Sequence, residues 1–141
     1  DARTIGQLTA RFVADELVPL ERMVIEREAA RGMGGDPLLP PEVEQRLRNL
    51  SKELGLWGID VPARFGGHDL GALIKCVVTI QMFYSITPFT LPPDSPNLYF
   101  LSECARGDQI DRYVLPYASG EKKSALALTE AGAGSDAAGI K

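Results

Sequence analysis

Residues 124–136 read S-A-L-A-L-T-E-A-G-A-G-S-D, and this stretch separates an α/β protein from a helical one. The apolar run from Ser124 to Leu128 predicts a short buried β-strand. Gly132 and Gly134 follow it, and because glycine has no Cβ, the backbone N–H groups of such a loop can approach a ligand closely. The chain stops soon afterwards, so we expect that it ends where its ligand site has only begun.

The spacing of Gly132, Gly134 and Ala137 fits the glycine pattern of a dinucleotide-binding βαβ unit. That unit also needs a helix after the glycines and an acidic residue about 20 positions further on. Only four residues follow Ala137, so the chain cannot complete the unit. A P-loop is also excluded, because no Gly-Lys-Ser/Thr follows the glycines. A ligand-binding loop and a plain turn both remain open.

Apolar residues recur at helical spacing through the first thirty positions. Pro19 interrupts this pattern, because proline removes one helix hydrogen bond and clashes with the preceding turn. We therefore expect two helices, or one kinked helix, over residues 4–30, and a break at the glycine-rich residues 31–37. The apolar positions are Ile5, Leu8, Phe12, Leu17, Leu20 and Val24.

Further helices are predicted downstream. Pro41 suits the first turn of a helix that Gly55 ends. Residues 56–71 are rich in glycine and predict a loop. Residues 72–86 are apolar nearly all round, which predicts a helix surrounded by protein, whose Lys75 must reach an edge or a partner. The first of these helices has the apolar stripe Val43, Leu47, Leu50 and Leu54, and its charged residues Arg46, Arg48, Lys52 and Glu53 predict a solvated face.

Two shorter helices complete the pattern. Ser95 resembles an N-cap, with Pro96 at the first helical position. A last short helix is expected to stop near Pro116. Since strands and helices do not alternate and no repeat occurs, the predicted fold class is all-α, with one β-strand and a Gly-rich loop at the C-terminal end.

The composition of the chain argues against several classes of function. The chain has 141 residues, 45% of them hydrophobic and 24% charged, as is usual for one globular domain. The net charge of −4 and the dispersed basic residues argue against nucleic-acid binding. Cys76 and Cys104 predict reduced thiols in the core, and one His with two Cys cannot form a structural zinc site. The most apolar stretch, 70–91, is interrupted by Lys75, Gln81 and Pro88, so no membrane span is predicted.

Three motifs, in the same order, resemble those of the acyl-CoA dehydrogenases. A-L-T-E-A-G-A-G-S-D at 127–136 resembles the flavin-binding signature, commonly A-L-T-E-P-G-A-G-S-D. Y-V-L-P at 113–116 and S-G-E at 119–121 resemble the preceding Y-L-P…S-G-E. L-G-L-W-G-I at 54–59, with the downstream Pro62 and Gly66-Gly67, resembles L-G-L-x-G-I-x-x-P-x-x-x-G-G. The likeness covers residues 40–141 specifically and the first forty only loosely.

The resemblance implies a helical amino-terminal domain over 1–123 and, at 124–141, the truncated start of a middle β domain. It implies FAD as cofactor, an acyl-CoA as substrate, and α,β-dehydrogenation, in which a carboxylate absent from this chain removes the α-proton and the flavin takes the β-hydride. The fragment alone would be inactive. It further implies electron-transfer flavoprotein as partner, a dimer or tetramer at full length, and a bacterial cytoplasmic or mitochondrial matrix location.

By the same resemblance, the cofactor-binding residues are Leu126, Ala127, Leu128, Thr129, Gly134 and Ser135. Ser135 is also expected to contact the acyl-CoA. No catalytic residue is assigned, because the family's base comes from the carboxy-terminal part, and Glu130 is expected to be structural. No metal ligand is assigned. Turn-forming roles for Thr129 and Ser135 stay open. Ala131 replaces the usual proline, which leaves the loop less rigid.

Other aromatic and imidazole side chains have simpler interpretations. His68 is expected on the surface, and Trp57 and Tyr84 are expected to pack. Packing is also the first interpretation for Phe89, Leu91, Leu98 and Phe100, with an acyl tunnel as the alternative. The alternative function for the whole chain is a stand-alone helical interaction module without flavin chemistry.

Overall fold

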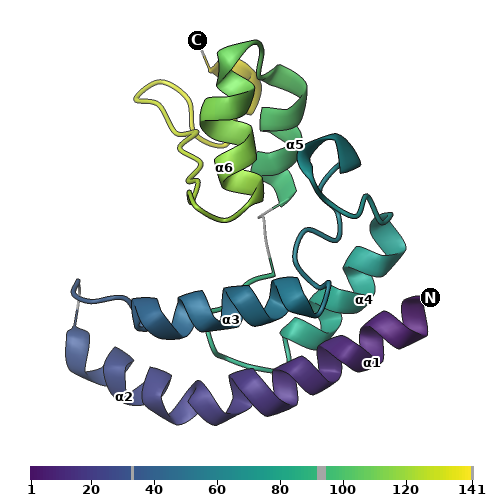
Figure 1. The fold of residues 1–141 in the computed structure, drawn as a ribbon. Helices are drawn as coiled ribbons and strands as arrows, with labels where there is room; N and C mark the ends of the chain where they lie inside the picture. The colour runs from purple at the N-terminus through teal and green to yellow at the C-terminus, as the bar shows by residue number, and fades with distance from the viewer. Residues whose placement is uncertain (33, 92–94, 141) are drawn as a thin grey trace.

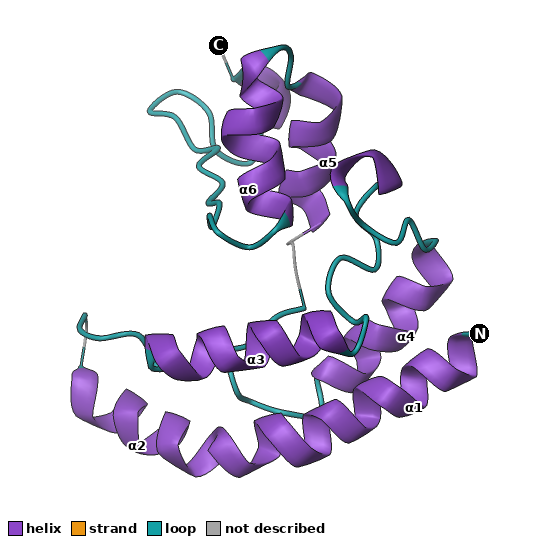
Figure 2. Ribbon diagram, in the orientation of Figure 1, coloured by secondary structure: helices purple, strands orange, loops and turns teal. Residues whose placement is uncertain are grey.

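The chain folds into helices joined by loops, shown in Figure 1 and by secondary structure in Figure 2. The computed structural model describes residues 1–32, 34–91 and 95–140. The all-α fold class is thereby confirmed, and no strand occurs within those ranges. Met33, in the predicted break, and Pro92, Pro93 and Asp94, just before the predicted N-cap Ser95, lie outside the described residues.

The helical segments, in chain order, are α1 (Ala2–Phe12), a π-helical segment (Val13–Leu17), a 3-10 turn (Val18–Leu20), α2 (Glu21–Arg31), α3 (Pro41–Glu53), α4 (Ala72–Met82), α5 (Ser95–Cys104), a second π-helical segment (Ile110–Val114) and α6 (Leu115–Ala118). Short 3-10 turns occupy Ala63–Phe65 and Ala137–Gly139. The connections between the helices differ in length, and the longest, residues 54–71, joins α3 to α4.

The first thirty residues form one bent helical run, which confirms the predicted kink (Figure 1). Asp1 caps its start, because its carboxylate accepts a hydrogen bond from Thr4 N at 2.9 Å. Around Pro19 the α-helix gives way to π and 3-10 turns, since proline cannot donate a helix hydrogen bond. The buried Thr87 hydroxyl donates to the Leu17 carbonyl oxygen at 2.8 Å, which ties the bend to the chain after α4.

The main core lies between this bent run and α3. Leu17, Leu47 and Leu56 are almost fully buried there, together with Phe12 and Phe89. Leu47 belongs to the predicted apolar stripe, so the period-3.6 pattern identified the inner face of α3 correctly. A second, smaller core joins the loop after α3 to α5 and α6 and contains Val61, Leu98, Tyr117 and Ala118.

The prediction that residues 72–86 form a helix surrounded by protein is wrong. The helix ends at Met82, and among the described residues its main contact is with α1, on the side where Val78 is buried. The opposite side is exposed, with Leu73 70% and Phe83 84% accessible. Hydrophobicity indicates that a face is suited to burial, but the covering segment must also be present. Both Cys76 and Cys104 are exposed, so the predicted core thiols are also wrong.

The buried strand predicted at 124–128 does not form. Residues 124–129 have no regular secondary structure, and Leu126 and Leu128 are 63% and 55% exposed. A strand needs a neighbouring strand to satisfy its backbone N–H and C=O groups, and the described residues contain none. Pro116 also does not end its helix: it occupies the first turn of α6, where its missing N–H is not needed.

Candidate functional site

The candidate site is the loop 124–136 together with the residues that hold its beginning. Trp57 follows α3, and its Nε1–H donates to the Ala118 carbonyl oxygen at 2.9 Å. The guanidinium of Arg48 and the ammonium of Lys52 lie 5.8 Å and 5.2 Å from its ring centroid. Such cation–aromatic contacts add to burial in fixing the ring. Trp57 therefore packs, as predicted.

Arg48 is the second residue that holds the loop's beginning. Its Nη1 donates to the Gly120 carbonyl oxygen at 2.5 Å, and its Nη2 lies 2.9 Å from Glu44 Oε1. The side chain is only 16% exposed, so the predicted solvated face is wrong for this residue. Its Nε–H is buried without a hydrogen-bond acceptor in the described chain. In the sequence, the i,i+4 pair Glu44–Arg48 and the chain's single Trp are the signals that point to this contact.

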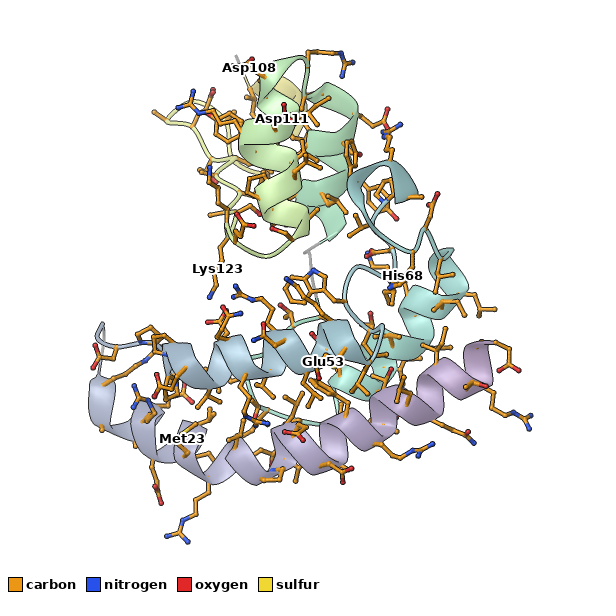
Figure 3. The ribbon with its side chains drawn as sticks, viewed as in Figure 1. Met23, Glu53, His68, Asp108, Asp111 and Lys123 are labelled. Carbon is orange, nitrogen blue, oxygen red and sulfur yellow. The ribbon has the colours of Figure 1, made fainter. Side chains whose placement is uncertain are left out.

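Lys123 adds an ion pair across the same junction. Its Nζ lies 2.7 Å from Glu44 Oε1 and 2.9 Å from Oε2, and Figure 3 shows the side chain extending toward α3. Burial raises the pKa of the Glu44 carboxyl, but the hydrogen bond and charge of Lys123 and the charge of Arg48 outweigh it. The pKa of Glu44 therefore lies below its usual value. A cavity of about 210 Å³ lies beside these groups, lined also by Phe89, Tyr117 and Ser124.

The loop itself extends from this junction. Asn97 Nδ2 donates to Ser124 Oγ at 2.8 Å, which ties the loop to α5. A tight turn follows, in which Glu130 N donates to the Ala133 carbonyl oxygen at 2.9 Å and Ala133 N donates back at 3.3 Å. The backbone of Glu130 thus helps to close this turn, and the structural role expected for its side chain stays a prediction.

The predicted cofactor residues all lie on this loop and are largely exposed: Leu126, Ala127, Leu128, Thr129, Gly134 and Ser135. A Cβ added at Gly132 or Gly134 would have no neighbour within 4 Å, and neither glycine has a positive φ. Nothing in the described chain therefore requires glycine at these positions.

The remaining candidates are scattered. His68 is exposed on the connection between α3 and α4, as predicted (Figure 3). Phe89 and Leu98 are buried in the cores and Leu91 packs against the main core, so the packing prediction is correct for these three. Phe100 and Tyr84 are exposed, so it is wrong for them. Lys75 reaches the predicted partner, because its Nζ lies 3.0 Å from the buried Asp60 carboxylate.

The part of the chain that the structure describes has neither a group of side chains suited to a metal ion nor a helix suited to a membrane span. Within the described ranges, no three His, Cys, Asp or Glu side chains are grouped so that they could hold a metal ion. The described helices include none with the length and hydrophobicity needed to cross a bilayer.

Comparison with known proteins gives the family. The sequence profile of the acyl-CoA dehydrogenase N-terminal domain matches residues 1–121. An (R)-benzylsuccinyl-CoA dehydrogenase of Thauera aromatica is 44% identical over 141 aligned residues, covering 96% of this chain and 35% of that protein. A probable acyl-CoA dehydrogenase of Bacillus subtilis is 38% identical over 109 residues, covering 71% and 18% of the two chains.

A third relative is the subunit CarC of a caffeyl-CoA reductase-Etf complex of Acetobacterium woodii, which is 33% identical over 103 residues, or 70% of this chain and 27% of that protein. No solved structure gives a significant match. The chain thus spans about a third or less of the length of these relatives. With its helical fold and the profile match over most of its length, the chain belongs to the acyl-CoA dehydrogenase family, an oxidoreductase family, and corresponds to its amino-terminal domain.

Proposed function

We propose that this chain is the amino-terminal part of an FAD-dependent acyl-CoA dehydrogenase, and that residues 126–135 contact the flavin and the thioester. One observation carries the proposal: an exposed, glycine-containing loop directly follows the anchored end of a helical domain of this family. The domain boundary near residue 123 is part of the same proposal.

The loop residues fit a flat, partly polar cofactor. Leu126 and Leu128 offer exposed apolar surface. Thr129 and Ser135 offer exposed hydroxyls that can donate hydrogen bonds. A flat ligand lying against the backbone would also explain the open glycines, Gly132 and Gly134, which the rest of the described chain does not explain.

We propose separate roles for the cofactor and for the side chains of the loop. FAD, when bound, accepts the hydride that leaves the β-carbon of the acyl thioester. Leu126 and Leu128 would exclude water from the ring, and the hydroxyls of Thr129 and Ser135 would orient cofactor and substrate. No carboxylate of this chain is proposed to remove the α-proton; we expect that base outside residues 1–141.

The names of the relatives guide the choice of substrate and partner. The Thauera protein is named for (R)-benzylsuccinyl-CoA, and the Acetobacterium protein is a subunit of a complex with Etf. We propose an acyl-CoA thioester as substrate and electron-transfer flavoprotein as electron acceptor. A homo-oligomer, dimer or tetramer, in a bacterial cytoplasm or mitochondrial matrix belongs to the same proposal.

An absorbance spectrum of the intact gene product tests the proposal. We expect a flavin band that is bleached anaerobically by an acyl-CoA, with (R)-benzylsuccinyl-CoA as the first compound of the panel. A flavin band that no acyl-CoA bleaches would contradict the reaction. A protein that stays colourless after FAD is added would favour the alternative, a helical interaction module.

A further inference from the structure

We infer that Arg48 and Trp57 are positioning residues for the cofactor loop, defined as residues 126–135, and that they act through the backbone of Ala118 and Gly120. The inference rests on the proposed function, because it concerns the same loop. It goes beyond it by assigning a role to two residues of the helical domain, far away in the sequence.

The chain just before the cofactor loop is anchored at four successive points. Trp57 holds the Ala118 carbonyl oxygen, Arg48 holds the Gly120 carbonyl oxygen, and two side-chain contacts follow. The latter are Lys123 to Glu44 and Asn97 to Ser124. The anchoring side chains belong to α3, to Trp57 and to α5, so residues 118–124 are held by parts of the chain that lie far apart in the sequence.

Beyond these anchors the chain is held less firmly. No hydrogen bond joins residues 125–129 to other described residues. Only five residues, 121–125, separate Gly120 from Leu126. Because each residue extends the chain by at most about 3.6 Å, Leu126 cannot lie more than roughly 20 Å from Gly120, so the position of Gly120 limits where the cofactor loop can begin. Trp57 and Arg48 thus fix the backbone at Ala118 and Gly120, from which the segment leading to the loop starts, and the contacts of Lys123 and Ser124 continue this anchoring.

The fit between Trp57 and Gly120 is specific. Gly120 has φ +81°, a conformation that favours glycine, and a Cβ added there would lie 2.3 Å from Trp57 Cζ2. Arg48 also keeps its Nε–H buried without an acceptor, which is unfavourable in itself. The same guanidinium donates to the Gly120 carbonyl oxygen and to Glu44 Oε1, so it holds this carbonyl at a defined place beside α3.

Measurement of FAD binding by the intact protein tests the inference. Arg48→Lys keeps the charge but loses the planar fork, and Trp57→Phe keeps an aromatic ring but loses the Nε1–H donor. We expect the dissociation constant for FAD to rise at least tenfold in each variant, with a shifted flavin absorbance spectrum. Arg46→Lys is the matched control, because Arg46 lies on the same helix but pairs with Glu16 at 2.5 Å; it should stay within twofold of wild type.

Three outcomes of this experiment distinguish a failure of the inference from a failure of the proposed function. Folded Arg48→Lys and Trp57→Phe variants that bind FAD with wild-type affinity and spectrum would overturn the inference and leave the proposed function intact. If the wild-type protein does not bind FAD, the proposed function fails first. If both variants fail to fold, Glu44→Gln decides instead: it removes the charge that orients the Arg48 guanidinium, and a threefold or greater rise in the dissociation constant supports the inference, whereas an unchanged constant overturns it.

Discussion

Gly120 packs against the indole ring of Trp57, 63 positions earlier in the chain, so closely that a Cβ on Gly120 would lie 2.3 Å from Trp57 Cζ2. Two independent features therefore require glycine at position 120 of the S-G-E sequence. One is its φ of +81°, and the other is the ring that would clash with a Cβ. This contact joins the end of α6 to the residues that follow α3, and it lies directly before the proposed cofactor loop.

Gly120→Ala should therefore destabilise the fold by about 2–4 kcal/mol, because backbone strain and a steric clash act together. Gly55→Ala is the matched control. Gly55 has φ +68°, but a Cβ there would meet nothing within 4 Å, so only the strain of about 1 kcal/mol applies. Urea unfolding followed by circular dichroism compares the two; equal losses would contradict the close contact with Trp57.

Thr87→Val should cost about 1–2 kcal/mol. The Thr87 hydroxyl is buried and satisfies the Leu17 carbonyl oxygen at 2.8 Å where the helix is irregular, so valine leaves a buried acceptor unpaired. Thr90→Val changes an exposed position of the same loop and should stay within about 0.5 kcal/mol. The same unfolding experiment distinguishes them, and indistinguishable midpoints would argue against this bridge.

Leu47→Ala and Leu73→Ala form a second matched pair. Leu47 is fully buried between the bent helical run and α3, so its truncation should cost about 2–5 kcal/mol. Leu73 is 70% exposed on α4, and its truncation should change stability by less than about 0.5 kcal/mol in residues 1–141. A large loss from Leu73→Ala in that chain would mean that the outer face of α4 is covered there.

The pH dependence of stability should report on Glu44. Its pKa is lower in the folded chain than in the unfolded chain, so its interactions stabilise the fold above the unfolded pKa, about 4.3. This contribution is lost as the pH falls through the folded pKa. Glu44→Gln should therefore unfold more easily than wild type at pH 7, and the difference should shrink steadily below about pH 4. A difference independent of pH would contradict the ion pairs with Lys123 and Arg48.

The sequence predicted most of the helices because their signals are local. The spacing of Val43, Leu47 and Leu50 identified the inner face of α3, and Pro19 identified the bend. The environment of α4 could not be predicted in the same way. Its residues are apolar all round, and this pattern does not say which segment, if any, covers each face.

The site was predictable in part and for the same reason. The glycine-containing loop is a local pattern, and it does lie exposed at the end of the helical domain. The strand expected at 124–128 depends on a partner strand elsewhere in the sequence, and local patterning cannot supply one. The contact of Arg48 with Gly120 joins residues 72 positions apart, so helical spacing alone placed this arginine on the solvated face.

The most direct test of the central claim is an equilibrium titration of FAD into the intact apoprotein, comparing wild type with Thr129→Val and Ser135→Ala. If these hydroxyls contact the cofactor, each variant should bind FAD at least tenfold more weakly, which corresponds to about 1.4 kcal/mol. Wild-type affinity in both variants, with wild-type circular dichroism, would contradict the assignment of this loop to the flavin.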